Sequence, residues 1–173
     1  MHYIDETKHL LSDLVGRVIE SASSHSSSQT VTIARPRAEV ERFWRDPENL
    51  SEVLGEVAEV RATEPSTYEW TLHSGADGRA TWKTTLLEED GHLRFVGSTD
   101  EDTPSAQGLE LEISFRDAPR DLGTEVTMRA RTPLPDLLTG AGMFTALYRA
   151  RARLQTGEMP TLAHNPSARS TAR

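Results

Sequence analysis

The sequence contains no cysteine, and this absence excludes several kinds of chemistry. Without a thiol the chain forms no disulfide bond, offers no thiolate to a metal ion and has no cysteine nucleophile. Its six histidines are scattered and include no His-Glu-x-x-His pair, so we expect no metal site. The Gly-x-Ser-x-Gly sequence of many hydrolases is also missing. We therefore predict no metal, no cofactor and no acyl-transfer hydrolysis.

Apolar residues are few and form no long run. Hydrophobic residues make up 36% of the 173 residues, and the mean hydropathy is -0.54. No run approaches the roughly 18 apolar residues of a membrane-spanning helix, and residues 1–20 are too polar for a signal peptide. A chain of this length fills one ordinary domain. We expect a modest core with polar ends, located in the cytoplasm.

Positive charge is scarce overall but concentrated near the C-terminus. The chain has 27 acidic and 19 basic residues, and its net charge of -8 argues against a nucleic-acid-binding protein, which needs basic surfaces. Residues 129–173 nevertheless contain seven arginines and only two acidic residues, Asp136 and Glu158. This basic segment favours neutralisation of the acidic body within the molecule. A partner surface or a peripheral contact with anionic lipid stays open.

The first 28 residues predict an accessory helix and a linker. Residues 5–20 place leucine, valine and isoleucine at the spacing of one helical face. Residues 21–28 are mostly serine, whose hydroxyls compete with helical hydrogen bonds, so we expect a flexible linker. We assign residues 1–28 to this helix and linker, 29–158 to the domain and 159–173 to a flexible tail. The helix would bury its apolar face on a neighbouring surface or a second subunit, so it allows an oligomer.

The domain begins with a strand at 30–34 and two short helices. Pro36 suits the first turn of a helix, because its missing N–H has no helical partner there, and Trp44 ends the apolar stripe of this helix. Asp46 and Pro47 predict the N-cap and first residue of a second helix. This second helix extends to residue 54.

Six segments of alternating polarity follow, at 57–61, 67–73, 79–87, 93–97, 107–115 and 125–132. The turns between them are short and rich in glycine and aspartate, which favours hairpins between antiparallel strands. Residues 140–156 return to helical periodicity, and Gly157 ends this helix.

This order of elements resembles the helix-grip fold of the START-like (SRPBCC) superfamily, in its polyketide cyclase/dehydrase and coenzyme-Q-binding branch. The resemblance covers residues 29–160 and is carried by the order of short motifs: 31–36 (VTIARP), Val40 to Trp44, Trp70, Gly78 with Trp82, 95–98 (FVGS), Gly108, 123–126 (GTEV) and 154–160 (LQTGEMP). It implies an α+β fold, in which a curved antiparallel sheet of about seven strands wraps around a long C-terminal helix. Two short helices follow the first strand, and the interior holds an apolar cavity for a lipid, isoprenoid, polyketide or similar ligand.

Within this architecture, alternation along the strands and periodicity along the last helix select candidate ligand contacts. We predict eight ligand-binding residues: Trp70, Trp82, Phe95, Met128, Met143, Leu147, Tyr148 and Arg151. Tyr148 and Arg151 lie on one flank of the last helix, where both side chains can donate to a ligand head group. Every one of these residues also suits an ordinary core or a solvent-facing helix flank.

Three functions fit this outline. The first, which we favour, is binding of a hydrophobic small molecule by a carrier, chaperone or sensor without catalysis. The second is a polyketide cyclase/dehydratase-type enzyme, which needs a polar group in the cavity to move a proton. The strand residues able to supply that group fall by alternation on the opposite face: Glu69, His73, Arg94 and Arg129. The third is a protein-interaction module whose cavity is filled by its own side chains.

Overall fold

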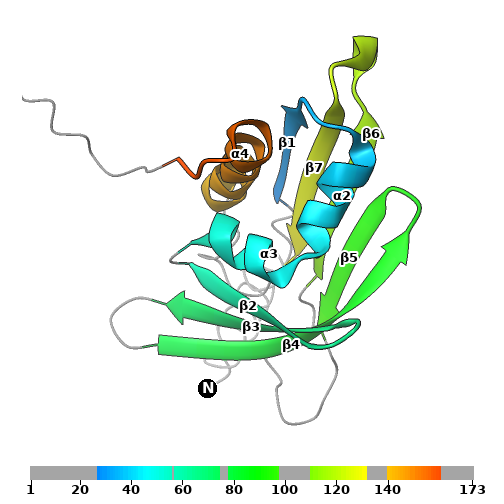
Figure 1. Cartoon of the computed structure of the whole chain (residues 1–173). Helices are drawn as coiled ribbons and strands as arrows, with labels where there is room; N and C mark the ends of the chain where they lie inside the picture. The colour runs from blue at the N-terminus through cyan, green and yellow to red at the C-terminus, as the bar shows by residue number, and fades with distance from the viewer. Residues whose placement is uncertain (1–26, 56, 75–77, 98–109, 132–139, 161–173) are drawn as a thin grey trace, which may run out of the picture.

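The computed structural model describes residues 27–55, 57–74, 78–97, 110–131 and 140–160, which form one curved sheet with helices (Figure 1). The strands are β1 (Ser27–Ile33), β2 (Ala58–Glu64), β3 (Thr67–Ser74), β4 (Gly78–Glu89), β5 (His92–Gly97), β6 (Glu110–Asp117) and β7 (Thr124–Arg131). They pair in the order β1-β7-β6-β5-β4-β3-β2, and every pair is antiparallel. The predicted seven-stranded antiparallel sheet is confirmed.

Among the described residues, three α-helices lie within the bend of this sheet (Figure 1). They are α2 (Arg37–Arg45), α3 (Pro47–Leu54) and α4 (Gly140–Thr156), and a short 3-10 helix, η3 (Pro119–Asp121), joins β6 to β7. The long helix α4 packs mainly against β1 and α3. This arrangement is the α+β helix-grip fold expected from the sequence.

The capping residues of α3 determine where this helix begins and ends. The Asp46 carboxylate accepts a hydrogen bond from the Glu48 backbone N–H at 2.8 Å, and Pro47 occupies the first helical position. Gly55 ends the helix with φ +60° and ψ -127°, a conformation that favours glycine. A Cβ atom at Gly55 would lie 2.2 Å from Nη1 of Arg149 on α4. This glycine therefore leaves room for the Arg149 guanidinium.

Strand β1 begins at Ser27, earlier than the predicted start at residue 30. Its serines pair with β7, where Ser27 lies opposite Ala130 and Ser28 lies opposite Arg129. Pairing with a neighbouring strand outweighs the weak strand preference of serine, which is why alternation alone set the start too late. The predicted N-terminal helix and the C-terminal tail after residue 160 lie outside the described residues, so the division into helix, domain and tail stays a prediction.

The inward and outward faces of the strands agree with the predicted alternation. Trp70, Trp82, Phe95 and Met128 are buried, with exposed fractions of 5%, 4%, 0% and 1%. The four strand residues predicted on the opposite face are exposed or half-buried: Glu69, His73, Arg94 and Arg129.

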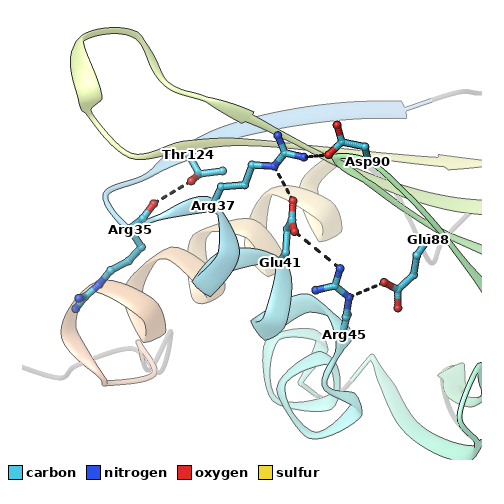
Figure 2. Close-up of polar contacts among 7 residues, drawn as sticks. All are labelled: Arg35, Arg37, Glu41, Arg45, Glu88, Asp90 and Thr124. Carbon is cyan, nitrogen blue, oxygen red and sulfur yellow. Dashed lines mark hydrogen bonds and ion pairs between the residues drawn. The ribbon is translucent and has the colours of Figure 1, made fainter.

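One end of the domain, here named the closed end, ties α2 to the hairpin of β4 and β5 (Figure 2). The Arg37 guanidinium donates to Glu41 and to Asp90, each at 2.6 Å. From the last residue of α2, Arg45 Nε donates to the Glu88 carboxylate at 3.0 Å. These contacts lie on the surface, where the Asp90 side chain is fully exposed.

The closed end also joins β7 and the segment after the edge strand β1 to α4. The Thr124 hydroxyl at the start of β7 donates to the Arg35 carbonyl at 2.9 Å, as Figure 2 shows. The Arg35 Nε then donates to the Leu154 carbonyl of α4 at 2.7 Å. Gly123 permits this approach, because a Cβ atom there would lie 2.1 Å from the Ile33 carbonyl oxygen.

Candidate functional site

An apolar cavity lies between the sheet and the helices at the opposite end of the domain, here named the open end. It is lined by Leu54, Val57, Ala58, Trp70, Leu72, Trp82, Thr84, Phe95, Leu111 and Met128. Its volume is only about 30 Å³, so the protein's own side chains nearly fill it. Four of the predicted ligand-binding residues, the two tryptophans, the phenylalanine and Met128, meet at this cavity.

A wider space, here named the entrance groove, lies between α3 and α4. It has a volume of about 300 Å³ and is lined by Val53, Leu54, Val57, Met128, Ala141, Gly142, Met143, Thr145, Ala146 and Arg149. Leu54, Val57 and Met128 line both the groove and the cavity. The entrance groove therefore adjoins the cavity along these three shared side chains.

The cavity contains few polar atoms. The Trp70 indole N–H donates to the Thr84 hydroxyl at 2.8 Å, and both groups are buried. Phe95 packs edge-on against the Trp70 ring at a centroid distance of 5.4 Å. The indole N–H of Trp82 is buried without a hydrogen-bond partner among the described residues, as is that of Trp44, which does not line the cavity. Trp82 Nε1 is thus a donor that a bound acceptor would satisfy.

Arg149, the charged residue in the described lining of the groove, is not among the ligand-binding residues predicted from the sequence. Its Nη1 donates to the Val53 carbonyl at 3.3 Å, and its Nε is buried with no partner in the described structure. Thr145 precedes it by one helical turn and lines the same wall. The glycine at position 55 was the one sequence signal for this contact. Its missing side chain leaves the space that the Arg149 guanidinium occupies.

The predicted residues of α4 have different surroundings. Met143 and Leu147 are buried, and Met143 lines the entrance groove. Tyr148 is 45% exposed and stacks on Phe144 at a centroid distance of 6.4 Å. Arg151 is exposed, and its Nε donates to the Gln155 side chain at 2.9 Å.

Neither Tyr148 nor Arg151 lines the cavity or the groove. Helical periodicity correctly identified the buried stripe of α4, but the groove borders the other flank of this stripe, which carries Thr145 and Arg149.

The charged strand residues face away from this site. On the outer surface Arg94 donates to Glu110 at 2.7 Å, and this hydrogen bond raises the pKa of Arg94 above its ordinary value. His92 Nδ1 lies 3.2 Å from the Glu112 carboxylate. In the described parts of the lining of the cavity and the groove, no aspartate, glutamate, histidine or lysine occurs. The site therefore offers a ligand apolar contacts and a few hydrogen-bond donors.

The described ranges contain no group of three or more histidine, aspartate or glutamate side chains placed to hold a metal ion. None of their helices is long and apolar enough to cross a membrane.

Comparison with known proteins identifies a family and similar folds. Residues 24–155 match the family described as polyketide cyclase/dehydrase and lipid transport. The crystal structure of DR_A0006 from Deinococcus radiodurans is 22% identical, with a TM-score of 0.65, and the match covers 78% of this chain and 100% of that one. TTHA0849 from Thermus thermophilus is 20% identical, with a TM-score of 0.56 and coverages of 77% and 99%.

A third similar structure is the solution structure of the Aha1 dimer from Colwellia psychrerythraea, 11% identical with a TM-score of 0.56 and coverages of 78% and 99%. At these identities the structural likeness shows the fold alone. No curated protein matches the sequence.

Proposed function

Because this chain belongs to the polyketide cyclase/dehydrase and lipid transport family, we propose that it binds a hydrophobic small molecule in the entrance groove and the cavity. The observation that carries this proposal is that the groove and the cavity share three apolar wall residues, Leu54, Val57 and Met128. An apolar ligand in the groove contacts all three and gains about 25 cal/mol per Å² of apolar surface removed from water.

The dimensions of the site limit the size of the ligand. Small-molecule sites commonly have volumes of about 300 to 1,000 Å³, and the entrance groove, at about 300 Å³, is at the lower limit. The cavity of about 30 Å³ accepts more of a ligand only if a lining side chain moves. Met128 is suited to such a movement, because methionine is unbranched and adopts many rotamers. We therefore propose a ligand of modest size.

The chemistry of the lining supports binding without catalysis, as in a carrier, chaperone or sensor. A cyclase or dehydratase moves a proton by means of an acid or base that contacts the substrate. Among the described residues the lining supplies no carboxylate and no imidazole. The one hydroxyl of the cavity, that of Thr84, already accepts a hydrogen bond from Trp70. The enzyme alternative is therefore the weaker one.

A protein-interaction module is the second candidate, and two observations favour it. The cavity is nearly filled by side chains, as this alternative requires. On the outer side of α4, Phe144 and Tyr148 are 56% and 45% exposed and stack on each other. Exposed aromatic side chains of this kind are common in protein interfaces.

Ligand binding with a matched pair of variants on α4 tests the proposal. Thr145 and Thr156 each donate a hydroxyl hydrogen bond to the carbonyl four residues earlier, at 2.9 Å and 2.7 Å. Only Thr145 lines the entrance groove. Thr145→Phe therefore fills the groove, whereas Thr156→Phe places the same side chain outside it. Neither variant adds a tryptophan, so the fluorescence of Trp70 and Trp82 reports binding in both.

We expect saturable fluorescence changes when decanol, farnesol or naphthol is added to the wild-type protein, and native mass spectrometry to detect the same complexes. Thr145→Phe should weaken binding at least about tenfold, a change of roughly 1.4 kcal/mol, while Thr156→Phe should stay within about twofold. If none of the three compounds binds, the proposal is wrong. Concentration-dependent association of the chain through α4 would then support the interaction module.

A further inference from the structure

The arginines of the described structure differ in how their charge is balanced. Four half-buried arginines pair with a carboxylate: Arg35 with Glu39, Arg37 with Glu41, Arg45 with Glu88 and Arg94 with Glu110. Those without a carboxylate partner are exposed to water: Arg42, Arg116, Arg120, Arg129, Arg131 and Arg151. Arg149 belongs to neither group, because it is half-buried and no described carboxylate pairs with it.

The described surroundings of Arg149 give its guanidinium one hydrogen bond and leave its buried Nε without a partner. A guanidinium has five N–H donors in a planar fork. Here Nη1 makes one long hydrogen bond of 3.3 Å to the Val53 carbonyl, and the buried Nε makes none. The missing side chain of Gly55 provides the space, since a Cβ atom there would lie 2.2 Å from Nη1. A partly buried cation is costly unless an anion pairs with it, and no carboxylate of the described residues pairs with Arg149, so this position is complementary to an anion.

We propose that Arg149 binds the carboxylate of an amphiphilic ligand whose apolar chain lies in the entrance groove. This inference rests on the proposed function and specifies the class of ligand. The groove beyond the guanidinium is apolar and is formed by side chains such as Leu54, Val57 and Met128. An aliphatic chain that starts at Arg149 therefore passes along these side chains toward the cavity.

The charge of the groove favours a carboxylate over a phosphate monoester. Arg149 is the one cationic side chain in the described lining of the groove. A carboxylate carries a single negative charge and accepts two parallel N–H bonds from one guanidinium. A phosphate monoester carries nearly two charges at pH 7, and one of them would lack a cation in this groove. The groove volume of about 300 Å³ suits a chain of moderate length.

Three compounds of equal chain length test this inference: decanoate, methyl decanoate and decanol. Each is titrated at pH 8 into the wild-type protein, Arg149→Met and Arg151→Met, with tryptophan fluorescence as the readout. Arg151→Met is a matched control, because Arg151 lies on the same helix, is exposed and does not line the groove. Thermal unfolding of each variant verifies that it is folded.

We expect the wild-type protein to bind decanoate at least about tenfold more tightly than methyl decanoate, as a charged hydrogen bond allows. Arg149→Met should abolish this preference by weakening decanoate binding alone. Arg151→Met should keep the preference within about twofold.

If the wild-type protein binds all three compounds equally, the head-group assignment is overturned while the proposed apolar binding stands. If it binds none of them, the proposed function itself is contradicted. Both outcomes come from the wild-type protein, so they are decisive even if Arg149→Met does not fold.

Discussion

The two ends of the domain are closed by different kinds of contact. At the closed end, polar contacts join α2 to the hairpin of β4 and β5, and β7 to Arg35 just after β1 (Figure 2). Arg35 also donates to the Leu154 carbonyl of α4. Between α3 and α4, which border the entrance groove, the described side-chain polar contacts are the 3.3 Å contact from Arg149 to the Val53 carbonyl and the 3.3 Å ion pair between Arg153 and Glu52. The apolar cavity and the entrance groove lie where such polar contacts are few.

Two kinds of contact hold the closed end together, namely surface ion pairs and close packing of the backbone. The ion pairs of Arg37 with Glu41 and of Arg45 with Glu88 are partly exposed to water, and such pairs contribute roughly 0 to 1 kcal/mol each. The close backbone approach at Gly123 and the buried apolar side chains beneath the ion pairs cannot be replaced by water. We therefore expect backbone packing, rather than surface charge, to keep this end closed while the other end admits a ligand.

Gly123→Ala should produce the largest loss of stability, because it breaks the closed end. Gly123 has φ +113°, and a Cβ atom would lie 2.1 Å from the Ile33 carbonyl oxygen and 2.7 Å from Ala34 Cα. Both are backbone atoms, so relief requires β1 to separate from β7. We expect the free energy of unfolding to fall by about 3 kcal/mol or more, measured by urea denaturation.

Gly157→Ala is the control for Gly123→Ala. Gly157 also has a positive φ, +76°, but a Cβ atom there would meet no atom within 4 Å. The free energy of unfolding of Gly157→Ala should fall by about 1 kcal/mol, from backbone strain alone. Equal losses in the two variants would show that the close approach at Gly123 contributes nothing.

Truncation of two leucines on neighbouring strands allows the packing at the two ends to be compared. Leu93 on β5 and Leu111 on β6 both point inward and are 1% and 4% exposed, but Leu111 alone lines the cavity. Leu93→Ala should destabilise the fold by about 3 kcal/mol. Leu111→Ala should cost less, about 2 kcal/mol, because a side chain beside empty space makes fewer contacts.

Leu111→Ala also enlarges the cavity, so we expect it to bind farnesol more tightly than the wild-type protein does. Urea denaturation with and without farnesol measures both effects. If farnesol stabilises Leu93→Ala as much as Leu111→Ala, the ligand does not enter at the open end.

Much of the fold could be predicted because local signals and tertiary structure agree. Asp46 and Pro47 carry the chemistry of a helix start, and alternation placed Trp70 and Trp82 on the inner face. The predicted start of β1 was wrong, because the pairing of Ser27 with β7 is a tertiary contact that the local sequence does not indicate.

The candidate site was predicted less completely than the fold, again because it depends on tertiary contacts. Periodicity finds the buried stripe of α4, yet it does not indicate which flank of the stripe meets a neighbour. The position of α3 decides this, and it brings Val53 and Gly55 to Arg149 rather than to Arg151. The polar residue of the groove thus depends on a contact between segments far apart in the sequence.

The smallest predicted effect concerns Tyr68, which joins β3 to the end of α2. Its side chain is 5% exposed, its ring packs edge-on against Phe95, and its hydroxyl donates to the Arg45 carbonyl at 2.7 Å. Tyr68→Phe should lower the free energy of unfolding at pH 7 by about 1 kcal/mol, because the Arg45 carbonyl loses its donor. Tyr148→Phe, which changes an exposed tyrosine, should have almost no effect.

The effect of Tyr68 should also depend on pH in a defined direction. Burial raises the pKa of Tyr68 above its ordinary value of 10.0. Below pH 10 the phenol is protonated in both the folded and the unfolded chain, so its hydrogen bond contributes fully to the free energy of unfolding. Above pH 10 the unfolded chain loses the proton first, because its pKa is the lower one. The free energy of unfolding therefore falls as the pH rises through the folded-state pKa. The stability advantage of the wild-type protein over Tyr68→Phe should therefore shrink as the pH rises above 10. A constant difference between wild type and Tyr68→Phe across this range would mean that the phenol is not desolvated, and that the contact between α2 and β3 is open to water.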